Sequence, residues 1–492
     1  MIAFILIALQ VLLLGYFCYF GFYNYLYGFA SIYKHPLLKA KNISNKKVAV
    51  VIVSYNEKEV IADTIKACEQ LSYENKVIIV GDDSNDYETI RVLENIAEKK
   101  GCRKIRGFGT NSEIFESQKF VIFHRHKNEG FKAGNLKEME AYLKSRGFDY
   151  MYLLDADWRP QKDAIERCLE VIEADSAIAF VQTKRVGYHG KTSFLQRCLA
   201  LNEDGCYYVD QPGRQAVGDP ILFTGCCTLF RLEHLYAAEG FKPGHLTEDI
   251  DLTNRFYLMG YKGAYLDDVE NEGEVPPHYP AFRKQQERWT MGTARTLREY
   301  FWPIIKSNKL SWTEKLGQIR QNMYFTSPVA IEFSIILAFI SVFLITAKVD
   351  SIAISQYQYY LERITVPYST VLFAALASNF VAPLMVIIKK KDYLNFLAMP
   401  YATWLSWSVL HTYFLANIKG FFGVKAEWSL TPKTNRKIVN LKTKWHLGIK
   451  LANLATLLML FTIYSIEWYE LGWTDIYAFF WVPALIVGVF LS

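Results

Sequence analysis

Short runs of β-branched and other apolar residues alternate with helical patterns along residues 48–154, and this alternation limits the possible folds more than any other feature. Connections that contain a helix of about 10 to 15 residues join parallel strands, because a hairpin turn would be much shorter. The pattern predicts an α/β domain with a mostly parallel sheet, right-handed crossovers and a ligand crevice at the carboxyl ends of the strands. The expected strands are Val48–Val53, Val77–Val80, Phe120–Phe123 and Tyr150–Leu154, and the expected helices are Lys58–Leu71, Tyr87–Lys99 and Lys132–Lys144.

The last of these strands ends in two carboxylates, Asp155 and Asp157, which are followed by a tryptophan, an arginine and a proline. Two acids one residue apart can hold Mg²⁺ or Mn²⁺, since these ions take oxygen ligands and leave positions open for a substrate phosphate. Alternatively, Asp157 caps a helix that begins near Gln161, and the pair has no metal. The D-x-D pattern alone leaves both interpretations open.

Polar segments also follow the other expected strands. Ser54–Glu57 follows the first strand, Gly81–Ser84 follows the second, and Asn128–Asn135 leads into the helix before the D-x-D strand. Each segment alone is compatible with turn or cap chemistry, but the carboxyl ends of parallel strands meet at one edge, so together they predict a binding site. No G-x-G-x-x-G follows the first strand and no G-x-x-x-x-G-K-[ST] occurs, which argues against dinucleotide redox enzymes and P-loop phosphohydrolases.

Two later segments, LTEDIDL and QQERW, supply further candidate residues. In the first, Thr247 can cap a helix that begins near Glu248, and early acids suit the helix dipole. In the second, Gln285, Arg288 and Trp289 lie at positions i, i+3 and i+4, so a helix would present all three on one face.

The motifs VSYNE, GDDS, KAGN, LDADWRP, LTEDIDL and QQERW, in this order, resemble those of the family-2 inverting glycosyltransferases. Within that family the chain resembles the membrane-embedded synthases of cellulose, mannan, chitin and hyaluronan. The resemblance runs from Val48 to Thr293, and EVPPHYPAFRKQQERWTMGT is most similar to plant-type glucomannan and mannan synthase-like members. It implies a cytosolic α/β nucleotide-sugar-binding domain of the GT-A type, inserted between transmembrane helices.

The resemblance assigns donor-binding roles to residues whose side chains suit them. Tyr55 would stack on the nucleobase, while Glu57 and Asp83 would accept hydrogen bonds from base edges and ribose hydroxyls. Contacts to the rest of the nucleotide sugar, a UDP- or GDP-hexose, would come from Lys132, Asp155, Gln285 and Arg288. The metal, Mg²⁺ or Mn²⁺, would be held by Asp155 and Asp157, and it would neutralise charge on the leaving nucleoside diphosphate.

The resemblance also assigns the acceptor side. Asp249 would be the catalytic base, because an inverting single displacement needs one group to take the proton from the acceptor hydroxyl. Trp289 would stack on an acceptor sugar, and Glu248 and Gly225 would lie beside it. The chain has Cys226 next to Cys227 where many relatives carry other small residues, so the contact at that point is left open.

Apolar sequence is concentrated at the two ends of the chain, and we expect these ends to lie in the cell membrane. Residues 2–27 carry no charge and are long enough to cross a bilayer, without the basic start and cleavage site of a signal peptide. Lysines follow at positions 34, 39, 41, 46 and 47, which places the next domain in the cytosol. Later crossings are expected over Pro328–Thr346, Val366–Ile388, Leu447–Ile466 and Ile476–Leu491.

Two parts of the C-terminal region need separate interpretation. Tyr393–Ile418 has basic residues on both sides, which favours a hairpin bent near Pro400 over a sixth crossing. Thr431–Lys433 resembles part of a loop that closes over the donor site in cellulose synthases. The expected organisation is a transmembrane helix over 1–30, a glycosyltransferase domain over 47–296, interfacial amphipathic helices over 297–325, and a membrane domain over 326–492 with a gating-like loop at 419–446.

Composition narrows the remaining possibilities. A net charge of +6 is modest for 492 residues, so we expect no nucleic-acid partner. The eight cysteines include no C-x-x-C and no spacing typical of zinc, and reduced thiols are expected. His124 and His126 lie two apart on an expected strand, a placement more typical of a surface than of a metal site.

The expected function is processive synthesis of a β-linked polysaccharide from a nucleotide sugar at the cytosolic face, with the growing glycan as acceptor and passage through the surrounding helices. One alternative is an enzyme that adds a single sugar to a membrane lipid. Another is a transporter whose cytosolic domain only senses nucleotide sugar.

Overall fold

The computed structural model describes residues 2–43, 45–105, 112–187, 193–346, 370–424, 445–471 and 478–491. Its main feature is one nine-stranded sheet with the order β3-β4-β5-β2-β1-β6-β8-β7-β9. The strands are β1 (Val48–Ser54), β2 (Lys76–Asp82), β3 (Arg103–Ile105), β4 (Ser112–Glu116), β5 (Phe120–Arg125), β6 (Tyr150–Asp155), β7 (Ile178–Gly187), β8 (Thr228–Arg231) and β9 (Lys262–Gly273).

The centre of the sheet is parallel, as the sequence predicts. β1 pairs in parallel with β2 on one side and β6 on the other, and β2 pairs in parallel with β5. All seven residues of β1 are buried, which explains its continuous run of valine, alanine and isoleucine, since both faces of a central parallel strand are covered. Two strands, β4 and β8, run against their neighbours, so the sheet is mixed but mostly parallel.

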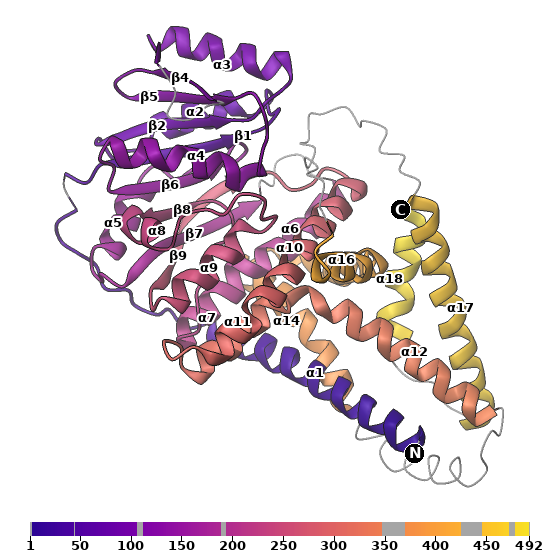
Figure 1. Ribbon diagram of the computed structural model, residues 1–492. Helices are drawn as coiled ribbons and strands as arrows, with labels where there is room; N and C mark the ends of the chain where they lie inside the picture. The colour runs from indigo at the N-terminus through magenta and orange to yellow at the C-terminus, as the bar shows by residue number, and fades with distance from the viewer. Residues whose placement is uncertain are drawn as a thin grey trace.

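Helices cover both faces of this sheet (Figure 1). Alternate residues of β1 enter two separate cores: Val48, Val50 and Ile52 pack with α2, α3 and α5, whereas Ala49 and Val51 pack with α4, α8 and α9. These helices are α2 (Ile61–Glu69), α3 (Tyr87–Lys99), α4 (Phe131–Ser145), α5 (Ala164–Ile172), α8 (Leu232–Ala237) and α9 (Glu248–Leu258).

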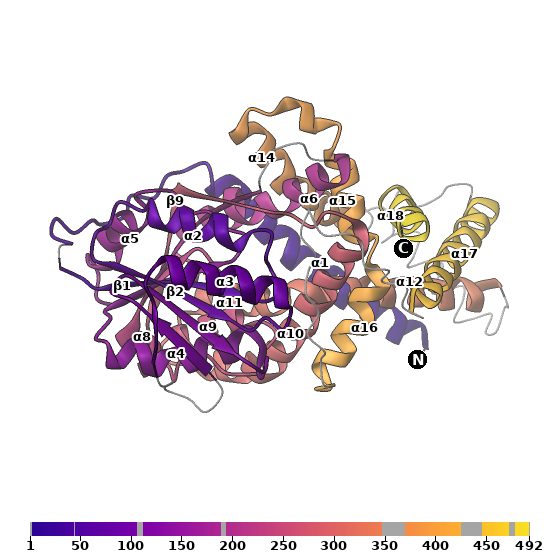
Figure 2. The ribbon, with the colours of Figure 1, turned by 90° about the horizontal axis from the view of Figure 1, so that it is seen from above.

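Most of the remaining helices lie to one side of the sheet domain (Figures 1 and 2), although α10 and α11 also pack against its core. They are α1 (Ile2–Ala30), α6 (Phe194–Gly205), the π-helix η1 (Cys206–Asp210), α7 (Gln211–Val217), α10 (Tyr279–Lys306), α11 (Trp312–Asn322), the 3-10 helix η2 (Tyr324–Thr326), α12 (Ser327–Thr346), the 3-10 helix η3 (Ser378–Phe380), α14 (Val381–Lys390), the 3-10 helix η4 (Tyr393–Phe396), α15 (Met399–Trp407), α16 (Leu410–Phe421), α17 (Trp445–Leu471) and α18 (Ala478–Leu491). The pair α17 and α18 stands farthest from the sheet in both views.

Fewer helices meet the requirements of a membrane crossing than the sequence led us to expect. Of the described residues, Thr370–Lys390 is the one helix long and apolar enough to span a bilayer by length and composition. Trp312–Asn322 and Tyr324–Ile340 meet them only as a pair, with a 50° bend between them, so the number is one or two. The apolar part of α17 is Gly448–Ile463, which is shorter than the roughly 20 residues that a crossing needs.

Two expected segments can be followed in the structure. The expected division between residues 296 and 297 falls inside α10, which continues from the sheet domain to Lys306 without a break. The segment Tyr393–Ile418 is divided among η4, α15 and α16, and one straight helix does not form there. Thr431–Lys433 and most of the expected loop at 419–446 lie outside the described residues.

Candidate active site

A single pocket opens at the carboxyl ends of β1, β2 and β6. All residues that the sequence suggested as donor, acceptor or metal contacts line it: Tyr55, Glu57, Asp83, Lys132, Asp155, Asp157, Gly225, Glu248, Asp249, Gln285, Arg288 and Trp289. They come from segments more than two hundred residues apart, and the strand order brings those segments together. What each residue does there remains a proposal.

Asp155 is the last residue of β6, where the parallel pairing with β1 ends, and Asp157 follows shortly after it. Asp157 does not cap a helix, because α5 begins at Ala164 with Asp163 at the N-cap position, so that alternative is wrong. A buried carboxylate beside a second one supplies the oxygen ligands that Mg²⁺ and Mn²⁺ prefer, and the pair therefore fits such an ion.

Lys132 connects three parts of the pocket. Its Nζ lies 2.5 Å from Asp155 Oδ1, 3.5 Å from Glu248 Oε1, and donates a hydrogen bond of 2.7 Å to the Gly225 carbonyl. Burial opposes ionisation, but the carboxylates of Asp155 and Glu248 raise the pKa of Lys132 above its ordinary value. The ammonium is therefore a positive charge held beside the Asp155–Asp157 pair.

The backbone before Lys132 explains the glycines of the KAGN segment. Gly130 has φ of +72°, and a Cβ there would meet Pro243 at 2.6 Å. Gly134 lies in the first turn of α4, where a Cβ would stand 2.0 Å from the Glu129 carbonyl. Both positions need glycine so that α4 can start close to the pocket and carry Lys132 into it.

Asp249 is in the first turn of α9, beside Glu248. Burial, together with the neighbouring charge of Glu248, raises the pKa of Asp249 to about 7, and burial also raises the pKa of Glu248. A Cβ on Gly225 would be 3.6 Å from Asp249 Oδ2, so this carboxylate faces the Gly225 loop across the pocket. A carboxylate with a pKa near neutrality is suited to act as a general base.

The helix α9 begins where the sequence predicts, but Thr247 does not cap it in the expected way. Thr247 is the N-cap residue, yet its side chain makes no capping hydrogen bond. Within the described residues the buried Thr247 hydroxyl has no hydrogen-bond partner. A Cβ on Gly292 of α10 would approach Thr247 to 2.4 Å, so the threonine packs tightly against that helix.

The helix α10 presents the QQERW segment as expected. Gln285, Arg288 and Trp289 line the pocket, while Gln286 accepts a 2.9 Å hydrogen bond from the Tyr413 hydroxyl of α16. Burial lowers the pKa of the Arg288 guanidinium, and nearby pocket carboxylates oppose that shift. The pocket face and the α16 face of α10 are thus separate.

The end of the pocket that contains Asp83 has a partner that sequence reasoning missed. Arg125 forms two hydrogen bonds of 2.6 Å with Asp83, which also accepts one of 2.9 Å from Asn135 Nδ2. Burial raises the pKa of Asp83 to about 6, although Arg125 works against that shift. The strand position of Arg125, between two histidines, gave no signal that its side chain reaches this site.

A second missed group lies on the opposite wall. Trp158, Arg185 and Glu203 line the pocket, and the Arg185 guanidinium stacks over the Trp158 ring at 4.2 Å. Arg185 Nη2 donates a 2.7 Å hydrogen bond to Glu203. Trp158 follows the D-x-D pair directly and was a possible signal, whereas Arg185 and Glu203 stand in segments without a recognisable motif.

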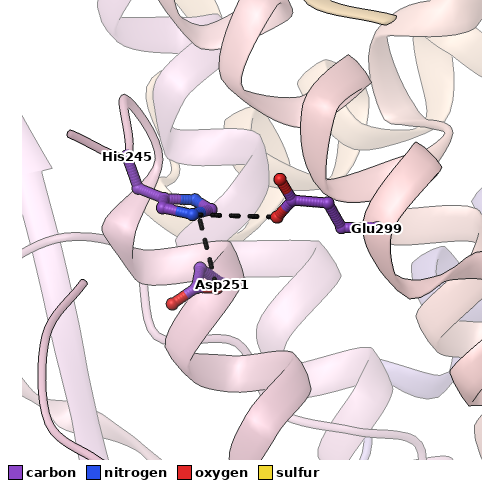
Figure 3. A group of neighbouring side chains, drawn as sticks. All are labelled: His245, Asp251 and Glu299. Atoms are coloured by element: carbon purple, nitrogen blue, oxygen red, sulfur yellow. Dashed lines mark ion pairs between the residues drawn. The ribbon is translucent and has the colours of Figure 1, made fainter. Parts of the chain in front are cut away.

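His245, Asp251 and Glu299 form the one group of three potential metal ligands among the described residues (Figure 3). Both carboxylates already have partners, since Asp251 accepts hydrogen bonds from Arg255 and Tyr300, and Glu299 accepts one from Arg295. Burial lowers the pKa of His245. The group is better suited to joining α9 to α10 behind Asp249 than to holding a cation.

Comparisons with known proteins agree with this geometry. Residues 150–492 match the profile of glycosyl transferase family group 2, and residues 49–235 match that of glycosyl transferase family 2. The chain is 31% identical over 271 residues to a probable glucomannan 4-beta-mannosyltransferase 11 of Oryza sativa subsp. japonica, a match that covers 55% of this chain and 45% of that one. It is 30% identical over 298 residues to a probable glucomannan 4-beta-mannosyltransferase 3 of Arabidopsis thaliana, covering 60% and 51%.

The chain thus spans about half the length of the curated relatives it matches. Among solved structures, it is similar to the mannosyltransferase PcManGT from Pyrobaculum calidifontis in complex with GDP-Man and Mn²⁺. That similarity has a TM-score of 0.48 with 16% identity, and it covers 79% of this chain and 98% of the other.

Proposed function

This chain belongs to glycosyl transferase family group 2, and from that membership we propose that it is an inverting, metal-dependent enzyme that extends a β-linked glycan from a nucleotide sugar. The donor is a UDP- or GDP-hexose. The relatives named as glucomannan 4-beta-mannosyltransferases favour a GDP-hexose over a UDP-hexose. The mostly parallel sheet with its site at the strand ends supports a GT-A-type catalytic domain.

The observation that carries the proposal is the environment of Asp249. Asp249 is half-buried in a pocket that has the Asp155–Asp157 pair with Lys132 on one side and the Gly225 loop on the other. With a pKa of about 7, a substantial fraction of Asp249 is ionised at neutral pH, and the carboxylate is basic enough to accept a proton.

The reaction follows from these positions. Asp249 takes the proton of an acceptor hydroxyl while that oxygen forms a bond to the anomeric carbon of the donor, and the bond from that carbon to the diphosphate oxygen breaks on the opposite face. Lys132 and Arg288 stabilise the departing nucleoside diphosphate by charge. Asp155 and Asp157 would hold the divalent ion, which supplies charge neutralisation for the leaving group.

Tyr55, Glu57 and Asp83 form the nucleoside end, and Trp289 with Glu248 and Gly225 the acceptor end. The Arg125–Asp83 pair fixes the carboxylate, so that its orientation is set before the donor arrives. Trp289 offers an aromatic face on which the apolar side of a sugar ring can stack.

The positions of α10, α16 and the helix Thr370–Lys390 support processivity and passage across the cell membrane. The helix α10 lines the pocket on one face and contacts α16 on the other, where Tyr413 joins the two helices through Gln286. The helix Thr370–Lys390 supports attachment to a lipid bilayer. The lysines that follow the first apolar segment favour a catalytic domain on the cytosolic side. A product that remains bound while the next sugar is added would leave the pocket along this helical side.

The test is product length. Membranes containing the protein would be incubated with labelled GDP- and UDP-hexoses and Mg²⁺ or Mn²⁺, and the products separated by size. We expect a ladder of β-linked polymer with one donor class and none with an Asp249→Asn variant. A product with a single sugar on an extractable lipid would favour the lipid-acceptor alternative over polymerisation. Transport of a solute without any sugar transfer would contradict the proposal altogether.

A further inference from the structure

The wall of the pocket formed by Trp158, Arg185 and Glu203 lies beside the Gly225 loop and has no role in the reaction described above. Arg185 Nη1 donates a 3.0 Å hydrogen bond to the Thr224 carbonyl, directly before Gly225. The Thr224 hydroxyl is 3.0 Å from the Tyr207 hydroxyl, which belongs to the π-helix η1. The loop that faces Asp249 is therefore held in place from this wall.

Arg185 is held by two aromatic rings and by a carboxylate. Its guanidinium lies between the rings of Trp158 and Tyr207, at 4.2 and 5.4 Å from their centroids, and it is paired with Glu203 at 2.7 Å. Its two terminal nitrogens bond different partners, Thr224 and Glu203, while the guanidinium stacks on a ring, a combination that lysine cannot reproduce. The π-helix next to Glu203 is also notable, since such helices occur frequently at functional sites.

The charge balance of the pocket determines which acceptors fit. Among the described residues that line it, the cations are Lys132, Arg185 and Arg288, and each lies beside carboxylates. The carboxylates that line the pocket are Glu57, Asp83, Asp155, Asp157, Glu203, Glu248, Asp249 and Glu274. Acids thus outnumber cations, and the excess remains after a divalent ion has neutralised the donor diphosphate.

We propose that Glu203 binds the hydroxyls of a neutral sugar acceptor, that Arg185 is the positioning residue of this wall, and that the wall excludes anionic acceptors. The proposal deepens the proposed function and rests on it. A carboxylate accepts hydrogen bonds from sugar hydroxyls strongly, whereas an acceptor bearing a carboxylate or phosphate would face Glu203 and Asp249 with no unclaimed cation to offset its charge.

The location of Glu203 fits an acceptor that leaves toward the helices. Glu203 is near the end of α6, and the preceding Asn202 donates hydrogen bonds of 2.8 Å to the Ala402 carbonyl and to the Ser406 hydroxyl of α15. The wall therefore lies between the reacting centre and the apolar helices.

The test compares two soluble acceptors with the full-length protein: a short neutral β-linked oligosaccharide and its counterpart of equal length that contains a uronic acid. We expect wild-type kcat/KM to favour the neutral acceptor by about tenfold or more, since like charges repel in a site that excludes water. In Glu203→Gln, the KM for the neutral acceptor should rise by about tenfold because a hydrogen bond to a charged group is lost. The preference for the neutral over the anionic acceptor should also shrink, because the charge of Arg185 is no longer neutralised by Glu203.

Glu270→Gln is the matched control. Glu270 pairs with Lys184, the residue before Arg185 in β7, and it does not line the pocket. It should behave as wild type. Arg185→Lys should restore part of the kcat that Arg185→Gln loses, without restoring the acceptor KM. Melting temperatures would show that the variants fold.

Equal use of both acceptors by the wild type would overturn the inference even if no variant folds. An unchanged neutral-acceptor KM in Glu203→Gln would also overturn it. A wild-type protein that transfers to neither acceptor while releasing no nucleoside diphosphate would instead contradict the proposed function, and the inference with it.

Discussion

Lys132 Nζ lies 2.5 Å from Asp155 Oδ1, and this contact joins the first turn of α4 to the end of β6. The two residues come from separate motifs, and the parallel arrangement of the sheet places them at the same edge. The pair holds a cation and a carboxylate at the point where a metal-bound diphosphate would meet the protein.

Removing the ammonium should weaken donor binding. For Lys132→Gln we expect the KM for the nucleotide sugar to rise by at least about tenfold, because truncating one partner of a buried ion pair leaves the other charge unbalanced. Lys132→Arg is the control, since it keeps the charge and should lose less. Initial rates across donor concentrations would measure this, and an unchanged donor KM in Lys132→Gln would argue against the assigned contact.

Activity should depend on pH through Asp249. The base works only when ionised, and burial with the Glu248 charge raises its pKa to about 7, so kcat/KM should fall as pH drops below about 7. Glu248→Gln removes the neighbouring negative charge, and the midpoint of this fall should move to lower pH. An acidic limb that has the same midpoint in both proteins would show that another group controls it.

Asp249→Asn should reduce kcat by about 10²- to 10⁴-fold, the usual contribution of a positioned general base. It should also stabilise the fold at alkaline pH. A carboxyl with a raised pKa binds its proton more tightly in the folded protein, so folding stability falls as pH rises from about 4 to 7, and asparagine removes this loss. Thermal melts should show a gain in Tm for the variant at pH 8 that disappears near pH 4, and a lower Tm at pH 8 would contradict the assignment.

Chelation should abolish transfer reversibly. Treatment with EDTA removes the ion that Asp155 and Asp157 would hold, and Mg²⁺ or Mn²⁺ should restore activity. Asp157→Asn should need a higher metal concentration for half-maximal activity, whereas Asp163→Asn, at the cap of α5, should not. Full activity in the presence of excess chelator would exclude the metal from the account.

The contacts behind Asp249 should affect stability and rate together. The Tyr300 hydroxyl donates a 2.6 Å hydrogen bond to buried Asp251, so Tyr300→Phe should cost about 1 to 3 kcal/mol of unfolding free energy. It should also lower kcat, because Asp251 belongs to the same helix as Asp249. Tyr87→Phe, at an exposed position, is the control for denaturant melts. Equal stability of the two variants would show that the bond contributes nothing.

Much of the sheet domain could be predicted because its local patterns are strong. The helix Tyr87–Lys99 has the bounds that the sequence suggested, and the strands β1, β2, β5 and β6 differ from expectation by only one or two residues at their ends. Ordered motifs also led to all twelve candidate residues of the pocket. These features depend on sequence periodicity and on side chains that follow strand ends, both visible without coordinates.

Other contacts depend on tertiary pairing and left no local signal. The strand β8 is short and gains its partners, β6 and β7, from distant segments. Arg125 and Arg185 meet Asp83 and Glu203 only after the sheet has formed. The hydroxyl of Thr247 does not cap α9 because the close approach of Gly292 decides its packing.

The most direct test of the account is the anomeric configuration of the first bond made. Purified protein, an α-linked nucleotide hexose and a neutral oligosaccharide would be combined, and the new anomeric proton followed by NMR from the earliest times. One base at Asp249 predicts a β-linked product in a single inverting step, absent in Asp249→Asn. An α-linked product, or an unchanged yield in that variant, would contradict the central claim.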